Sequence, residues 1–158
     1  MASRRKGRIL AFQALYSWDT GYSLTGDASI PEGLLDFSWA NQNIPDEKMT
    51  AFSRLLVCGT VENISGVDKM IQEHLDNWEL KRLNRVDLAI LRMSVYTLMF
   101  QDDMPPSIVI DEAVEISKEF GADDSYRFVN GVLDSVRKTL VQRQTLSGST
   151  ASKPAVTK

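Results

Sequence analysis

The sequence predicts an all-α fold of about seven helices, because apolar residues recur at three-to-four spacing and strand-like alternation is scarce. Glycine, proline and Ser/Thr/Asp clusters separate the helical segments by short connections, a pattern typical of a helical bundle. The 158 residues are 43% hydrophobic and 25% charged, which is ordinary for a globular domain with its own core.

The first helix is expected over residues 4–20, ending near Gly21. Its body is apolar on most sides, and only Lys6, Gln13 and Ser17 form a polar stripe. We therefore expect neighbouring helices to bury it on most sides and to hold its first turn in a fixed position.

Four basic residues open this first helix, and no Lys or Arg follows between residues 9 and 47: Arg4, Arg5, Lys6 and Arg8. Cations are unfavourable at a helix N-terminus, where the helix dipole is positive. A bound anion would reverse that penalty, since free N–H groups and basic side chains would face the same ligand. The turn therefore indicates a phosphate-backbone ligand, most simply nucleic acid, although a merely solvated basic terminus is the plain alternative.

The second part of the chain is expected to hold a short helix over 31–41 and a turn with a helix cap at 45–46. Helical spacing then continues to about Trp78, with a joint near residues 65–66. A central helix follows over 86–100, where the residues are apolar on nearly every side.

Arg92 is the exception within the central helix. A buried charge is costly unless it is paired, so a structural ion pair is the favoured interpretation and an RNA or protein contact the weaker one. Asp111 and Glu112, on the following helix, are the expected partners.

The last two helices are expected to begin at Pro105-Pro106 and just after residue 124, with Asp123 or Asp124 as the cap of the second. Gly121 fits the position that follows a helix end, and Gly131 is expected to permit close helix approach. The Ser/Thr/Lys-rich residues 144–158 predict a disordered tail after a single domain over 1–143.

Several function classes are excluded by what the sequence lacks. It has one His and one Cys without zinc spacing, no P-loop and no dinucleotide fingerprint, so we expect no metal, no cofactor and no enzymatic activity. No apolar run is long enough to span a bilayer, and no signal-peptide core follows the basic start. The single Cys58 cannot form an internal disulfide, which fits a reducing cytoplasm.

The net charge of −3 argues against a nucleic-acid ligand, but its distribution argues for one. Residues 1–8 carry four basic residues and no acidic one, and residues 125–158 carry six basic residues against one acidic. Basic ends on an acidic body predict a local anion-binding patch and a second surface of opposite character.

Two stretches of the chain resemble the NusB family of bacterial transcription antitermination factors. They are Arg4-Arg-Lys-Gly-Arg8 running into Gln13-Ala-Leu-Tyr16, and Asp124-Ser-Tyr-Arg-Phe-Val-Asn-Gly131. Residues 89–92 and 110–114 also resemble the family pattern in order and spacing. The resemblance covers residues 4–141 and departs at Tyr126, where other members often carry His or another polar residue, and in the Ser/Thr-rich tail.

The resemblance implies an RNA-binding fold of two small helical subdomains. It implies that the protein binds the single-stranded boxA element of ribosomal RNA leaders together with the small-subunit ribosomal protein NusE. This pair would join the antitermination complex on RNA polymerase, which the protein would contact indirectly. The acidic body is the expected surface for the basic ribosomal protein, by resemblance over the fourth to sixth helices.

Single strands are bound by cations on phosphates, by aromatic stacking and by polar groups on base edges. Arg4, Arg5, Lys6 and Arg8 are the expected phosphate contacts. The other expected RNA-binding residues are Gln13, Tyr16, Asp124, Ser125, Tyr126, Arg127, Phe128 and Asn130. Tyr16 and Phe128 are stacking candidates or core residues, and Asp124 caps its helix or accepts from a base. A single site requires the starts of the first and last helices to lie close together.

Two other interpretations stay open at this stage. NusB-like domains also occur as N-terminal modules of a ribosomal RNA cytosine methyltransferase, but no methyltransferase domain follows here, so a free-standing protein is favoured. The second interpretation is a helical protein-interaction module whose basic end binds an acidic partner or a membrane surface. Some family members form homodimers and others are monomers, so the oligomeric state is open.

Overall fold

The computed structural model describes residues 2–40 and 47–156, and side chains within 4–40 and 47–146. These ranges form six α-helices and three short 3-10 helices, with no strand among them, so the all-α prediction is confirmed. The α-helices are α1 (Ala2–Thr25), α2 (Glu47–Glu62), α3 (Ile64–Glu73), α4 (Arg85–Phe100), α5 (Pro106–Phe120) and α6 (Ser125–Val156). The 3-10 helices are η1 (Leu34–Asp36), η2 (Ser38–Ala40) and η3 (Leu80–Arg82).

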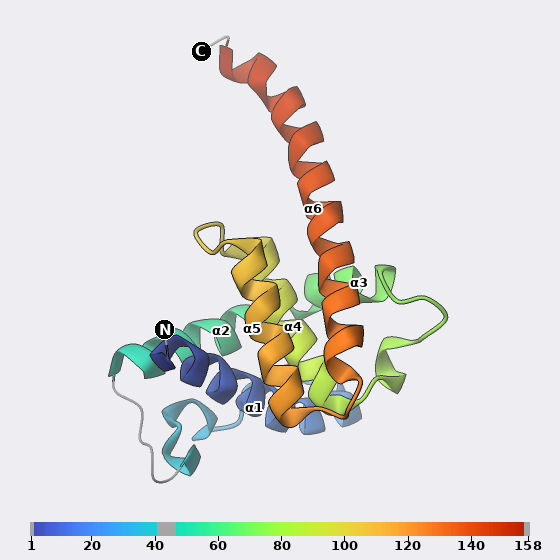
Figure 1. Ribbon diagram of the computed structural model, residues 1–158. Coiled ribbons are helices and arrows are strands. Elements are labelled where there is room, and N and C mark those ends of the chain that lie inside the picture. The colour runs from blue at the N-terminus through green and yellow to red at the C-terminus, as the bar shows by residue number, and fades with distance from the viewer. Residues whose placement is uncertain (1, 41–46, 157–158) are drawn as a thin grey trace.

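The α4 helix is the centre of the bundle, as predicted. Every residue from 87 to 97 is buried, and α4 packs against α1, α2, α3, α5 and α6 (Figure 1). Its start is fixed by Asn84, whose side-chain oxygen accepts from the N–H groups of Val86 at 2.8 Å and Asp87 at 3.3 Å.

The first turn of α1 is fixed against α2. A Cβ at Gly7 would lie 2.7 Å from Cδ2 of Phe52, so only glycine allows the two helices to approach this closely. The Ser53 hydroxyl donates to the Gly7 carbonyl oxygen at 2.8 Å. The support expected for the basic turn is therefore present.

Arg92 is buried and paired, but the predicted partners were wrong. Its Nε and Nη2 donate to the two carboxylate oxygens of Asp68 at 2.9 and 3.0 Å, and Nη1 donates to Asp19 at 2.8 Å. Burial acts to lower the pKa of Arg92, but the bonds and charges of Asp68 and Asp19 outweigh it and leave this pKa raised. The cluster joins α1, α3 and α4, and Glu112 has a different partner.

Several predicted boundaries were displaced. Gly21 lies inside α1, which ends at Thr25 before Gly26 with φ +73°, a left-handed conformation suited to glycine. The helix expected over 31–41 is two short 3-10 pieces within the described residues. The expected cap at 45–46 lies outside the described residues.

The joint between α2 and α3 lies at Asn63 rather than at 65–66, where Gly66 has open space around it inside α3. The α3 helix also ends at Glu73, before the expected Trp78. Gly21 and Gly66, which were interpreted as helix breakers, both lie on exposed helix faces. There the helix stability lost to a glycine is small enough to be tolerated.

Of two glycines near the α5–α6 connection, Gly121 follows the end of α5 as predicted, whereas Gly131 differs from the prediction. Gly121 is extended, with φ −92°, and a Cβ there would lie 2.7 Å from Cβ of Ser125, so a close approach explains it. Gly131 has open space around it, and the expected close helix approach is wrong.

The α6 helix continues to Val156, and the disordered tail expected over 144–158 stays a prediction. Its last turns extend away from the other helices (Figure 1). A domain boundary near residue 143 stays a prediction.

Candidate nucleic-acid interface

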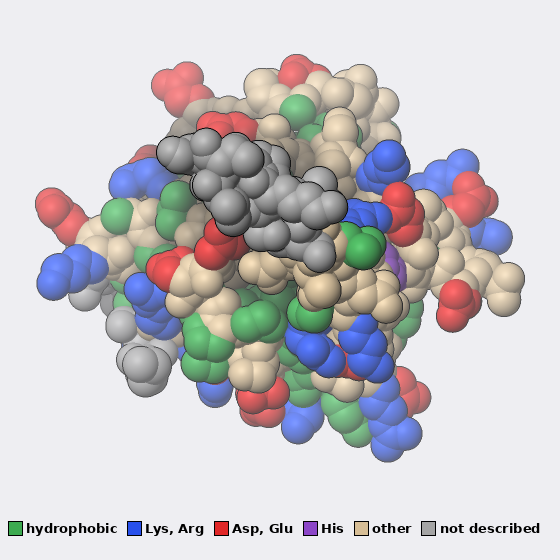
Figure 2. Space-filling view, turned by 90° about the horizontal axis from the view of Figure 1, so that it is seen from above, with side chains coloured by type: hydrophobic (Ala, Val, Ile, Leu, Met, Phe, Trp, Pro, Cys, Tyr) green, Lys and Arg blue, Asp and Glu red, His purple; other side chains and the backbone are tan. Residues whose placement is uncertain are grey.

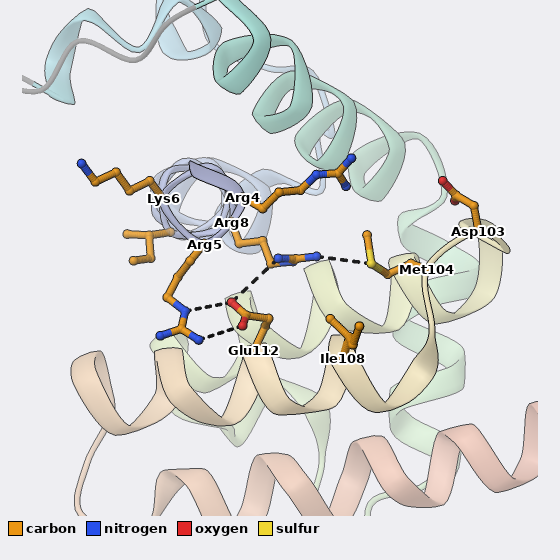
Figure 3. A pocket seen from close by; sticks show the side chains of 9 residues that line it. Arg4, Arg5, Lys6, Arg8, Asp103, Met104, Ile108 and Glu112 are labelled. Atoms are coloured by element: carbon orange, nitrogen blue, oxygen red, sulfur yellow. Dashed lines mark hydrogen bonds and ion pairs between the residues drawn. The ribbon is translucent and has the colours of Figure 1, made fainter. Parts of the chain in front are cut away.

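The basic turn of α1 borders a hollow of about 690 Å³ between α1, the α4–α5 connection and α5. Figure 3 shows Arg5 and Arg8 directed toward α5, Arg4 toward α2, and Lys6 at the border of the hollow with its ammonium directed away from Glu112. Asp103 and Glu112 also line this hollow, so acidic groups partly offset its basic side chains.

Arg5 makes a two-point contact with Glu112. Its Nε and Nη2 donate to the two carboxylate oxygens at 2.9 and 2.8 Å, a geometry that only Arg provides. The hydrogen bond from Arg5 lowers the pKa of Glu112 below its usual range, against the opposite effect of burial. Arg5 is therefore oriented before any ligand arrives, although part of its charge is already neutralised.

Arg8 lies beneath the basic turn rather than on it. It is buried, its Nη1 lies 3.8 Å from Glu112, and its guanidinium lies 5.4 Å from the centre of the Phe52 ring. Burial, the largest influence, lowers the pKa of Arg8, and Glu112 opposes that effect. This position suits support of the turn better than the phosphate contact that the sequence predicts.

Arg4 and Lys6 are the more accessible cations. The Arg4 guanidinium lies 4.5 Å from the centre of the Phe52 ring, so an aromatic face supports it while its side chain remains exposed. Lys6 is exposed and points away from Glu112 (Figure 3). With Arg5, they give three exposed cations on one helical turn.

Residues 124–131, the second stretch that resembles the NusB family, lie at the start of α6, and some are buried while others are exposed. Ser125 is buried, and its hydroxyl accepts from the Ala122 N–H at 3.0 Å. Burial raises the pKa of Asp87, and the influence of the Ser125 hydroxyl opposes this. Ser125 therefore fixes the α5–α6 connection and is poorly placed for the predicted RNA contact.

Asp124 immediately precedes α6 and is exposed. Its backbone carbonyl accepts from the N–H groups of Arg127 and Phe128 at 3.1 and 3.4 Å, as expected for a residue at a helix start. Among the described residues no hydrogen bond to its carboxylate is seen, so the predicted cap by that group is not observed, and the predicted base contact stays a prediction.

The remaining residues of the motif include an exposed cation. Arg127 is exposed, and its Nε donates to the hydroxyl of Tyr126 at 3.0 Å. The ammonium of Lys118, on α5, lies 5.3 Å from the centre of the Tyr126 ring. Asn130 is exposed one turn later, so Arg127 and Asn130 are available to a ligand.

The two stacking candidates have different environments. Tyr16 is 46% exposed on α1, whereas Phe128 is half-buried and packs against the core. Tyr16 and Gln13 border a small apolar hollow of about 150 Å³ with Val86 and Phe120. This hollow lies between the middle of α1, the end of α5 and the start of α4.

The starts of α1 and α6 are separated, contrary to the prediction. The α5 helix connects them: Glu112 holds Arg5, and Phe120, two turns further, packs against Phe12 with ring centres 5.2 Å apart. The end of α5, which leads into α6, thus meets the middle of α1, about 10 Å along the helix from Arg5. The predicted residues lie along an extended surface rather than at one point.

Charge is not concentrated on the face seen in Figure 2. Acidic and basic side chains alternate there, and apolar side chains gather between them. No cluster of three or more metal-ligating side chains occurs among the described residues. In the same part of the chain, no helix is long and apolar enough to cross a bilayer.

Comparison with known proteins gives a consistent result. The NusB family model matches residues 5–138. The transcription antitermination protein NusB of Treponema denticola is 56% identical over 135 residues, which cover 85% of this chain and 95% of that protein. The protein of the same name from Borreliella burgdorferi is 39% identical over 134 residues, 84% of this chain and 92% of that protein.

Solved structures are similar as well. A structure of the antitermination factors NusB and NusE in complex with double-stranded RNA matches with a TM-score of 0.74 at 30% identity, covering 88% of this chain and 98% of that chain. T. maritima NusB matches with a TM-score of 0.72 at 34% identity, covering 85% of this chain and 90% of that chain.

Proposed function

This chain belongs to the NusB family, and from that premise we propose that it is a transcription antitermination factor that binds the boxA element of ribosomal RNA leaders together with the ribosomal protein NusE. The pair would act within the antitermination complex on RNA polymerase, in the cytoplasm, without catalysing a reaction.

One observation supports RNA binding most directly: three exposed cations lie on the first turn of a helix whose body is buried. Arg4 lies against Phe52 and Arg5 against Glu112, so both guanidinium groups are oriented in advance. Their preorganisation reduces the entropy lost on binding. The N–H groups at the start of α1 add a second anion-binding element.

Specificity would come from the surface that runs from Gln13 and Tyr16 to the start of α6. Tyr16 and Phe128 offer aromatic faces to unpaired bases, and Asp124 and Asn130 offer polar groups to base edges. Tyr126 and Arg127 add a ring and a cation. Three phosphate contacts on a single strand predict a salt slope of about −2, which is modest and fits a need for NusE.

An RNA shift assay with and without NusE tests the function. We expect weak retention of a boxA RNA by this protein alone, strong retention when NusE is added, and little retention of a scrambled RNA of equal length. Equal retention of both RNAs under all conditions would instead favour a module that binds anions without sequence preference.

A further inference from the structure

A loop outside the interface described above combines an exposed tryptophan with basic residues. The connection between α3 and α4 contains Trp78, Lys81 and Arg82, and Arg85 opens α4. Trp78 is 55% exposed, although tryptophan is usually among the more buried residues. An exposed aromatic ring beside cations is the combination that binds single-stranded nucleic acid.

The backbone of this loop is held in place. Gln72 of α3 donates from Nε2 to the Trp78 carbonyl oxygen at 2.8 Å and accepts from the Leu80 N–H at 2.8 Å. The Arg82 N–H donates to the Glu79 carbonyl oxygen at 2.9 Å, which closes the turn of η3. Trp78 is therefore presented to solvent from a fixed backbone.

The cations of the loop are only partly neutralised. Lys81 lies 3.6 Å from Glu79, but both side chains are largely exposed, and such surface pairs are weak. Arg82 is exposed and forms no ion pair with the described residues. Asp76 and Glu79 equal Lys81 and Arg82 in number, so the loop offers an anionic ligand exposed local cations rather than a net positive charge.

The loop is continuous with the proposed RNA surface. Nη1 of Arg85 lies 3.1 Å from Oδ2 of Asp19, which is one turn beyond Tyr16 on α1. The next residue, Val86, borders the same hollow as Tyr16. Asp19 lies roughly 22 Å along α1 from Arg4, so the loop is at the opposite end of the surface from the basic turn.

We propose that Trp78, Lys81 and Arg82 form a second RNA subsite that binds single-stranded RNA flanking boxA. The Trp78 ring stacks on an unpaired base, and Lys81 and Arg82 contact phosphates. A duplex could use the cations but not the ring, because its bases are already stacked. This proposal rests on the proposed function and lengthens its binding surface.

Fluorescence titrations with two kinds of RNA test the subsite: boxA alone, and boxA extended by unstructured nucleotides on one side or the other. We expect one of the extended RNAs to bind at least fivefold more tightly than boxA alone. The double variant Lys81→Ala/Arg82→Ala should lose that gain and reduce the salt slope on the extended RNA by about 1.4. Its affinity for boxA alone should change less than twofold.

Two further variants isolate stacking from charge. Trp78→Ala should lower the affinity for the extended RNA at least fivefold and leave the affinity for boxA alone unchanged. Trp78→Tyr should restore most of the lost affinity. Lys138→Ala is the matched control, because Lys138 is an exposed lysine on α6 paired with Asp134 at 3.2 Å, as Lys81 is paired with Glu79. Thermal melting of each variant checks that it is folded.

The outcomes separate the two proposals. If boxA RNA is not bound even with NusE present, both the proposed function and the subsite are overturned. If boxA is bound but neither extension adds affinity, only the subsite is overturned. The subsite would also be overturned if the loop variants lost affinity equally for boxA alone and for the extended RNA. Full displacement of the extended RNA by poly-glutamate at equal charge would overturn it as well.

Discussion

Arg5 and Arg92 make the same kind of contact in different surroundings. Each directs Nε and Nη2 at the two oxygens of one carboxylate, that of Glu112 for Arg5 and that of Asp68 for Arg92. The Arg92 side chain is 4% exposed and has a second carboxylate, Asp19, whereas the Arg5 side chain is 45% exposed.

This difference separates a residue that holds the fold from one that is available to a ligand. Removal of Arg92 would leave the Asp68 carboxylate without a counter-ion and would leave Asp19 with Arg85 alone, and desolvated charges need a partner. Glu112 is already shared between Arg5 and Arg8, and water can replace what Arg5 provides. The same guanidinium–carboxylate contact therefore stabilises the fold at Arg92 and orients an accessible cation for a ligand at Arg5.

The largest effect should come from breaking the buried cluster. Arg92→Met keeps much of the side-chain volume but leaves the largely buried Asp68 carboxylate unpaired and Asp19 with Arg85 as its remaining partner, so the free energy of unfolding should fall by about 3–5 kcal/mol. Urea denaturation measures this, and Arg5→Ala is the control, with an expected loss below about 1 kcal/mol. The comparison fails if the two variants unfold at the same urea concentration.

A second experiment sharpens the same contrast within the start of α6. Phe128→Ala should lower RNA affinity by about 1–3 kcal/mol while the protein still melts cooperatively, because part of the ring is exposed for stacking. Its neighbour Val129 is fully buried, so Val129→Ala should lower the melting temperature and change RNA affinity little. Loss of cooperative melting in Phe128→Ala would instead identify Phe128 as a core residue.

The smallest effect concerns the pH dependence of the exposed pair. The pKa of Glu112 is lowered in the folded protein, so its stabilising contribution is present above the unfolded value of about 4.3 and is lost as pH falls through the lower folded value. Glu112→Gln should therefore be less stable than the wild type by less than about 1 kcal/mol at pH 6. The two curves of unfolding free energy against pH should meet at low pH, and a constant separation down to acid would contradict this.

Most of the fold was predictable because burial follows helical periodicity. The central helix was placed within one residue of its start, since its residues are apolar on nearly every side. Two of the errors in helix boundaries occurred at Gly21 and Gly66, which were interpreted as helix breaks. A glycine on an exposed helix face leaves the same sequence signal as one at a helix end, so only the structure separates the two.

The predicted RNA-binding residues illustrate a different limit. Their chemistry was visible in the sequence, but accessibility depends on contacts between distant segments. Arg5 and Glu112 are 107 positions apart, and Arg92 and Asp19 are 73 apart. No spacing rule reveals such pairs, and for that reason the burial of Arg8 and Ser125 was missed.

The central claim is that the exposed cations of the basic turn, rather than its buried Arg8, contact RNA phosphates. The most direct test is the salt dependence of boxA RNA binding by wild type and by the Arg4→Ala/Arg5→Ala variant. We expect a slope of about −2 for the wild type and about −0.7 for the variant, in which Lys6 is the remaining exposed cation of the turn. An unchanged slope and affinity in the folded variant would contradict the account.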